Sequence, residues 1–255
     1  MNDWDWARTL RAASLFARRR DGSPTGWPMT PLWPGDGHLY FNTYRTAAKA
    51  KLMMADQRIG VLLFDDGGDA LALQADAQLL TEQAEIEALA PRAMRIDGFT
   101  TTENANRTLD RLLTGKRVMF RVVARSSQRV NVPRSLRQGG VAISPAAKAP
   151  AGRDRNALAL DDGELAQFLA AASSGVASVI DEDGYPTASP VATSLVDGRL
   201  HVEPALAAGR AACVVVDRGV TYSDIVGVVV RGAPDTARAL PLDDVVSFAF
   251  AKLAG

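Results

Sequence analysis

Short apolar runs alternate with polar turns along most of the chain, and this pattern predicts a mainly β protein. Ile59–Phe64 is continuously apolar, and Asp66-Gly67-Gly68-Asp69 turns the chain into a second run, Ala70–Leu79. Runs of about four to eight apolar or alternating residues between Gly, Pro and Asp are typical of strands joined by turns. We expect further strands in the first half of the chain at Ser14–Arg19, Met29–Trp33, His38–Asn42 and Lys116–Ala124.

Helical patterns are fewer and shorter. In the first half they lie at Trp4–Ala12, Thr46–Met54, Glu82–Ala90 and Glu103–Leu113. In the second half, Asp161 or Asp162 is expected to cap a helix that runs to Ala172, and a short helix is expected at Leu206–Ala212. The remaining runs predict strands at Val176–Ile180, Thr187–Val196, Leu200–Glu203, Ile225–Arg231 and Val245–Ala251.

The chain contains one segment twice. DGSPTGWPMTPLWPGDGHLYFNTYRTAAKAK begins at Asp21, and DGYPTASPVATSLVDGRLHVEPALAAGRAA begins at Asp183. With one residue deleted in the second copy, the matched pairs are Asp21/Asp183, Gly22/Gly184, Pro24/Pro186, Pro28/Pro190, Asp36/Asp197, Gly37/Gly198, Leu39/Leu200 and Lys49/Arg210. The two copies begin at Asp21 and Asp183, much further apart than the roughly 20 to 50 residues of a solenoid period, so the repeat indicates a duplicated domain.

The repeat divides the chain into two domains. We expect a first domain at 1–137, a linker rich in Gly, Pro, Ala and charge at 138–156, and a second, abbreviated domain at 157–255. Each domain has its strands in hairpin order, which implies antiparallel pairing, and a sheet of that size tends to close into a small barrel. The predicted fold is two tandem barrels of antiparallel strands with a few short helices.

The composition of the chain limits the classes of molecule that it is expected to bind. Lys plus Arg equals Asp plus Glu, at 29 each, so no net field attracts nucleic acid or anionic lipid. The single cysteine, Cys213, excludes an internal disulfide and is expected to be a small buried hydrophobe. The chain shows neither a secretory signal at its start nor the roughly 20 apolar residues of a membrane span. We therefore expect a cytoplasmic protein that contacts neither membrane nor nucleic acid.

The clearest candidate for chemistry is the segment from Thr43 to Lys49, between a predicted strand and a predicted helix. Thr46 is expected to cap the helix, Lys49 lies about one turn further on, and Thr43 and Arg45 flank the entry. Unpaired amides at a helix start, a hydroxyl and two cations together suit an anion such as phosphate. Taken alone, the segment favours an ordinary capped helix that carries solvated cations over an anion site.

The order of these elements resembles a known family. DG-x-P-x-x-x-P, then a turn-DG-x-L-x-F-x-T hairpin, then R-T-x-x-K on a short helix, is similar to the pyridoxamine 5′-phosphate oxidase-like superfamily of flavin-binding split β-barrels, which includes flavin- and deazaflavin-dependent reductases. The resemblance implies an oxidoreductase that uses FMN, or a deazaflavin coenzyme in its place, on an unidentified small molecule. By matched position it implies that the flavin phosphate contacts Thr43, Arg45, Thr46 and Lys49. It also implies that Met29 and Thr30 lie beside the flavin ring.

Other residues add alternatives. The early aromatic residues Trp27 and Trp33 are candidates for a substrate pocket, or pack in the core and rim of a small barrel. His38 and His201 have no spacing typical of a metal site, but they leave haem binding open, since some split barrels bind haem. No residue pair indicates a catalytic acid or base. A split-barrel protein that binds flavin or haem without catalysis is the alternative function.

The second copy departs from the phosphate pattern. Thr43 corresponds to Pro204, whose neighbour Glu203 would repel a phosphate, and only Arg210 keeps the charge of Lys49. We therefore expect one cofactor site, carried by the first half. Split barrels of this family pair as homodimers, so the two halves are expected to pair within one chain as a pseudo-dimer, or two chains to pair through their first halves.

Overall fold

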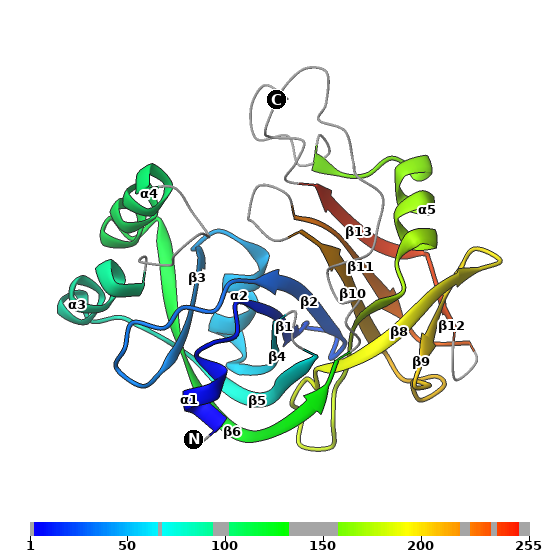
Figure 1. Ribbon diagram of the computed structural model, residues 1–255, viewed down its shortest axis with the longest axis horizontal. Helices are drawn as coiled ribbons and strands as arrows, with labels where there is room; N and C mark the ends of the chain where they lie inside the picture. Colours follow the sequence, from blue (N-terminus) through cyan, green and yellow to red (C-terminus); the bar gives the residue numbers. More distant parts are fainter. Residues whose placement is uncertain are drawn as a thin grey trace.

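The computed structural model describes residues 3–65, 68–93, 102–132, 158–219, 225–235 and 239–249. They form two curled antiparallel sheets, one from each half of the chain (Figure 1). The predicted mainly β fold with two split barrels and few short helices is thereby confirmed. The expected linker, 138–156, lies outside the described residues, so the domain bounds stay a prediction.

The first sheet has six strands in the order β2-β1-β4-β5-β6-β3. Their bounds are β1 Ala12–Arg18, β2 Pro24–Met29, β3 Leu39–Tyr44, β4 Arg58–Phe64, β5 Asp69–Leu79 and β6 Arg117–Asn131. The sheet curls until its two edge strands approach, because Leu32, just after β2, forms an isolated bridge with Tyr40 of β3. The barrel is therefore closed by a single bridge and not by a full ladder.

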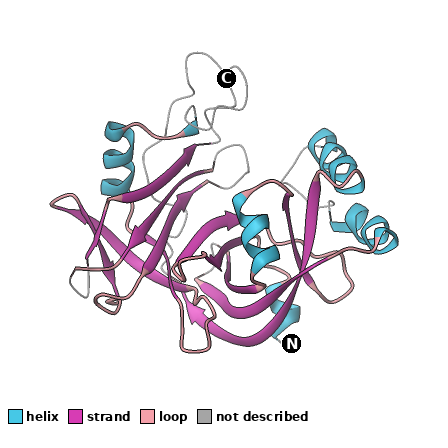
Figure 2. Cartoon of the chain, turned by 180° about the vertical axis from the view of Figure 1, so that it is seen from behind, coloured by secondary structure: helices cyan, strands magenta, loops and turns pink. Residues whose placement is uncertain are grey.

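Helices of the first half are α1 Asp3–Ala7, α2 Ala48–Ala55, α3 Gln83–Ala93 and α4 Thr102–Leu113. α2 packs against β1, β3 and β5 (Figure 2), and it buries Ala50 and Met53 in the barrel core. α3 and α4 lie on the side of the first barrel away from the second half (Figure 1). They cover a separate apolar cluster that includes Leu112 and Met119.

The second sheet has seven strands in the order β12-β9-β8-β7-β10-β11-β13. Their bounds are β7 Ser174–Val179, β8 Ser189–Val196, β9 Arg199–Glu203, β10 Ala212–Arg218, β11 Val226–Gly232, β12 Ala239–Pro241 and β13 Asp244–Ala249. α5, Asp162–Ala171, precedes them. Asp161 caps α5 as predicted, because its carboxylate accepts from the Glu164 amide while the Glu164 side chain accepts from the Asp161 amide.

The two sheets pack directly against each other. Phe16 of β1 and Leu62 of β4 share one buried cluster with Val176, Cys213 and Val215 of the second half. Leu15, the neighbour of Phe16, instead faces the interior of the first barrel. β1 and β10 are each covered on both faces, which explains why their sequences are apolar at consecutive positions and not at alternate ones.

Polar contacts across the interface are reciprocal. The Asp-Gly turn of the second copy contacts the first sheet, where the Tyr185 hydroxyl donates to Asp76 at 2.9 Å. The Asp-Gly turn of the first copy contacts the second sheet, where Arg19 pairs with Asp244 at 3.5 Å and Arg231 donates to the Thr25 hydroxyl at 3.5 Å. Each half thus uses its own turn to contact the sheet of the other half, as subunits do across a two-fold axis.

Two predicted features differ between the copies. The hairpin of the second copy forms, since Asp197 and Gly198 both have positive φ and close a two-residue turn between β8 and β9. The predicted hairpin between Met29–Trp33 and His38–Asn42 is reduced in the first copy to a single bridge, Leu32 with Tyr40: β2 ends at Met29, and β3 forms its ladder with β6. Pro31 and Pro34 lie in this connection, and proline has no N–H to donate to a ladder.

The predicted helix at Leu206–Ala212 is also wrong. This segment is a turn that includes Gly209 at φ +71°, and β10, which the sequence pattern did not separate from it, begins at Ala212. A glycine weakens a helix by roughly 1 kcal/mol relative to alanine. The short helix of the first copy thus has no counterpart in the second copy.

Candidate functional site

The start of α2 is the centre of the candidate site. Thr43, near the end of β3, is paired with Val118 of β6 and is only 4% exposed. The helix begins at Ala48 with Ala47 as its N-cap, and no side chain bonds to the helix start. The prediction that Thr46 caps the helix is therefore wrong. Thr46 lies one residue before the N-cap, and its side chain is exposed. An uncapped start leaves backbone amides available to another acceptor.

Lys49 lies in the first turn of α2, and its ammonium is turned inward. Its Nζ donates to the Met29 sulfur at 3.3 Å, and a thioether is a weak acceptor. Burial, together with the nearby Arg117 guanidinium, lowers the pKa of Lys49 to about 8. Lys49 forms no ion pair with a carboxylate of the described residues. Met29 and Lys49, two residues predicted from distant parts of the sequence, are thus in contact.

Two arginines lie over the exposed ring of Tyr44, and a third, Arg45, follows Tyr44 in the chain. The guanidinium carbons of Arg117 and Arg111 lie 4.5 and 5.4 Å from the ring centroid. Arg117 also donates to the Asn42 side chain at 2.8 Å, and Arg45 donates its Nε to the Gly115 carbonyl at 3.0 Å. Neither Arg45 nor Arg111 pairs with a carboxylate in the described part of the chain. The region is therefore suited to attract anions.

Arg111 and Arg117 were not predicted as site residues. Arg117 alternates with Val118 along an ordinary strand, and Arg111 lies in the last turn of a helix, where a basic residue is common. Only the packing of α4 and β6 beside β3 brings them to Tyr44. No signal in the linear sequence distinguishes them from solvated cations.

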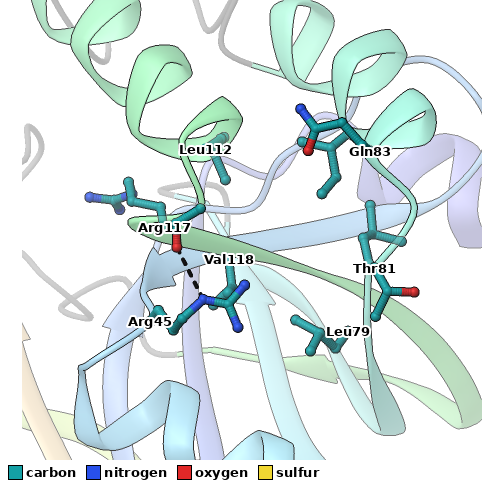
Figure 3. Close-up of a pocket in the computed structure, with 10 residues that line it drawn as sticks. Arg45, Leu79, Thr81, Gln83, Leu112, Arg117 and Val118 are labelled. Atoms are coloured by element: carbon teal, nitrogen blue, oxygen red, sulfur yellow. Dashed lines mark hydrogen bonds between the residues drawn. The ribbon is translucent and has the colours of Figure 1, made fainter.

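A cavity of about 190 Å³ opens next to Arg45, between the ends of α3 and α4 and the ends of β5 and β6 (Figure 3). Its walls include Leu79, Leu112 and Val118, and Arg45 lies at one side of it. Of the six residues predicted to bind the cofactor, Arg45 alone lines this cavity. Arg45 and Lys49 therefore face different spaces, although they are four positions apart.

The two predicted substrate-pocket tryptophans pack against the core of the first barrel. Trp27 lies opposite Leu15 in the β1–β2 ladder, on the core-facing side. Trp33 packs edge-to-face on Trp4 of α1 with ring centroids 5.8 Å apart, and its buried indole N–H has no partner in the described structure. Thr30, the other predicted ring contact, follows β2 and is half-buried.

The remaining candidates lie apart from this region. His38 is exposed and contacts Tyr40 edge-to-face with centroids 6.4 Å apart, and His201 lies on β9 of the other half. Cys213 is fully buried, as predicted, and burial raises the pKa of its thiol to about 12. Arg210, the counterpart of Lys49, donates to the Ile180 carbonyl. Its guanidinium is thus used within the second half.

The structure was compared with known proteins. No protein-family model and no curated protein matches the sequence. Among solved structures, a conserved hypothetical protein of Mycobacterium tuberculosis is 24% identical, over 51% of this chain and 85% of its own, with a TM-score of 0.42. A putative pyridoxamine 5′-phosphate oxidase of Listeria innocua (18% identical, 49% of this chain and 92% of its own, TM-score 0.37) is also similar. An FAD-binding protein of Mesorhizobium loti is similar as well: it is 18% identical, over 51% of this chain and 94% of its own, with a TM-score of 0.39.

Of these names, that of the Listeria innocua protein belongs to the family that the sequence resembles. Each of these matches extends over about half of this chain. Because their TM-scores lie below 0.5, we base the proposals below on the residues of this chain. Among the described helices, none has the length and apolar character to cross a bilayer.

Proposed function

We propose that the first half binds a flavin through its phosphate, with FMN as the leading candidate and a deazaflavin coenzyme as its substitute. The observation that carries the proposal is Lys49. Its side chain is half-buried, with the ammonium turned inward against a thioether and near a second cation, and a partly desolvated charge without an opposite partner is costly. An anionic group at this point would supply the missing partner.

The start of α2 supports the same ligand. Its amides have no side-chain cap, Thr46 precedes them, and the positive end of the helix dipole favours a phosphate there. In our proposal Lys49 and Thr43 are the main protein contacts of the phosphate. Arg45, which the sequence also predicts as a contact, is turned toward the neighbouring cavity and contributes mainly through its field.

The protein's part in the proposed reaction is to bind and orient the cofactor. A bound flavin supplies the electron transfer itself. Met29 and Thr30, at the end of β2, are proposed to lie beside the flavin ring, and Trp27 and Trp33 to line the substrate side. No residue of the described site has the geometry of a catalytic acid or base, and we nominate none.

Titration of the purified protein with FMN and with riboflavin tests the proposal. The two compounds share the ring, so only the phosphate distinguishes them. We expect FMN to bind with at least about tenfold higher affinity, the size of a charge-assisted hydrogen bond. Equal affinity for both compounds would contradict the phosphate site, and failure of FMN and deazaflavin alike to bind would contradict the flavin assignment.

Turnover separates the enzyme from a binding protein. FMN that binds tightly and is reduced by a nicotinamide donor, then reoxidised by an acceptor, would support an oxidoreductase. FMN that binds tightly and exchanges no electrons would favour the non-catalytic alternative.

A further inference from the structure

The cavity beneath α3 and α4 depends on two helices that have no counterpart in the described part of the second half. In the first sheet the chain passes from β5 through α3 and α4 to β6. In the second sheet β11 ends at Gly232 and β12 begins at Ala239, which leaves no room for a pair of helices. Whatever the cavity does is therefore not a property that both barrels share.

The cavity has an apolar body. Leu79, Ile86, Leu112 and Val118 line it, and they come from β5, α3, α4 and β6. Its volume is about 190 Å³. An apolar cavity of about 150 Å³ is large enough for a benzene ring, so this cavity admits a single ring or a short alkyl chain with a small polar head.

Two arginines line the cavity; Arg117 donates to the Asn42 side chain, and Arg45 is the one directed into the cavity. The Arg45 Nε donates to the Gly115 carbonyl and its backbone N–H to the Lys116 carbonyl, each at 3.0 Å, so its position is fixed at both ends. Figure 3 shows the guanidinium directed toward Leu79 and Val118. Because Arg45 pairs with no described carboxylate, its two Nη groups keep the planar fork that a carboxylate fits.

The other polar groups at the rim are already engaged. The Thr81 hydroxyl donates to Glu82 at 3.4 Å, and the Gln83 side-chain amide donates to Glu87 at 2.9 Å. These two carboxylates at the start of α3 would repel a ligand of high negative charge. A wall that is apolar in part, the Arg45 guanidinium and nearby acidic residues together favour a ligand with a single negative charge.

We propose that this cavity binds a small monocarboxylate whose body is one aromatic ring or a short alkyl chain, with its carboxylate on the Arg45 Nη groups. The site is separate from the phosphate position at Lys49, which does not line the cavity. It does not depend on the proposed flavin function, and it would stand if no flavin bound.

Titration with benzoate, followed by methyl NMR of the whole chain, tests the proposal. We expect the methyl signals of Leu79, Leu112 and Val118 to shift saturably. Benzyl alcohol, which has the same ring and no charge, should bind about tenfold more weakly or worse. Absence of these shifts up to about 50 mM benzoate, far above a millimolar affinity, would overturn the proposal.

Variants locate the ligand. Arg45→Gln removes the charge from an exposed position and should weaken benzoate binding about tenfold or more. Ile86→Trp should abolish binding by filling the space, while Arg45 is untouched. Arg92→Gln, on the same helix as Ile86 but outside the cavity, is the matched control and should leave the affinity unchanged. Benzoate that binds Arg45→Gln as well as the unchanged protein would overturn the assignment.

Competition separates this site from the flavin site. FMN at saturation should leave the benzoate affinity unchanged. Competitive loss of benzoate binding would place both anions in one site and overturn the separate cavity. If FMN does not bind at all, the flavin proposal fails while the benzoate titration still decides this one.

Discussion

The ammonium of Lys49 lies where the protein itself offers one thioether and a neighbouring cation. Arg210, at the same point of the second copy, donates instead to the Ile180 carbonyl. The two residues match in sequence, but Arg210 bonds to the backbone of its own half, whereas the Lys49 ammonium has only a weak acceptor. The asymmetry between the copies, inferred from Pro204 and Glu203, therefore extends to the hydrogen bonds of the basic residues.

Removing these two side chains should have unequal effects. Lys49→Ala is expected to weaken FMN binding by about 1–3 kcal/mol, because it removes a charge-assisted contact to phosphate. Arg210→Ala should change FMN affinity by less than about 0.5 kcal/mol. Fluorescence titration of FMN measures both, and equal losses at the two positions would contradict the single-site proposal.

The lowered pKa of Lys49 predicts a pH effect on binding. As pH rises through about 8, the free protein loses the ammonium while a phosphate keeps both charges, so the FMN dissociation constant should rise about tenfold between pH 7 and pH 9. Lys49→Arg is the control, since arginine stays protonated over this range. An affinity that is flat with pH in the unchanged protein would show that Lys49 does not meet the phosphate.

The sequence could predict that Thr43, Lys49 and Met29 belong together only by resemblance, because periodicity says nothing about contacts between strands. It could not predict that Thr46 fails to cap the helix. Nor could it predict that Arg45 turns toward Gly115, since that depends on where α4 ends and β6 begins.

At the scale of elements, β4 illustrates how closely the two sheets approach. Gly60 has no side chain, and a Cβ there would lie 2.4 Å from the Pro186 carbonyl oxygen and 2.8 Å from that of Thr187. Both are backbone atoms of the second half, which cannot swing aside as a long side chain can. The glycine permits the contact between sheets.

Gly60→Ala should therefore destabilise the protein by about 2–3 kcal/mol, the upper part of the range for overpacking. Gly163→Ala is the control within α5, where the nearest atom lies 3.4 Å from the added carbon and alanine is favoured over glycine by up to about 1 kcal/mol. Urea unfolding measures both variants. A neutral Gly60→Ala would mean that the sheets lie further apart than described.

The pattern of apolar residues predicted most strands because turns and apolar runs are local signals. The second-copy hairpin followed from its Asp197-Gly198 turn. The first-copy hairpin is reduced to the Leu32–Tyr40 bridge, because the connection after Met29 contains prolines, and the ladder of β3 forms with β6. That pairing joins residues far apart in the chain, and no local pattern specifies it.

At the scale of the whole molecule, both halves contribute to one buried cluster. Val215 of β10 is fully buried there, and its Cγ2 lies 2.8 Å from where a Cβ of Gly26 in β2 would be. Unfolding of one half would therefore expose apolar surface of the other. This arrangement predicts that the two halves unfold together.

The position of the tryptophans makes this testable, because all four lie between Trp4 and Trp33 in the first half. Val215→Ala, in the second half, should cost about 2 kcal/mol. It should lower the midpoint of tryptophan fluorescence and that of far-UV circular dichroism by the same amount. Val196→Ala, at an exposed position, is the control. A fluorescence midpoint that does not move would show that the halves unfold independently.

The internal pairing also predicts the state of association. The face of β1 and β4 that pairing with a second chain would need is already covered by β7 and β10. We expect light scattering to give a mass near 27.1 kDa, that of one chain. A stable species of twice this mass would indicate pairing through another surface.

The reciprocal contacts of the two Asp-Gly turns have a consequence for how such a molecule can change. In a homodimer every substitution occurs in both subunits, once on each side of the two-fold axis. A substitution that damages one site therefore damages both. In this chain the counterparts are encoded separately. Arg210 can bond to the backbone of its own half while Lys49 stays available to a ligand. In the same way, α3 and α4 can be added to one barrel without any change in the other.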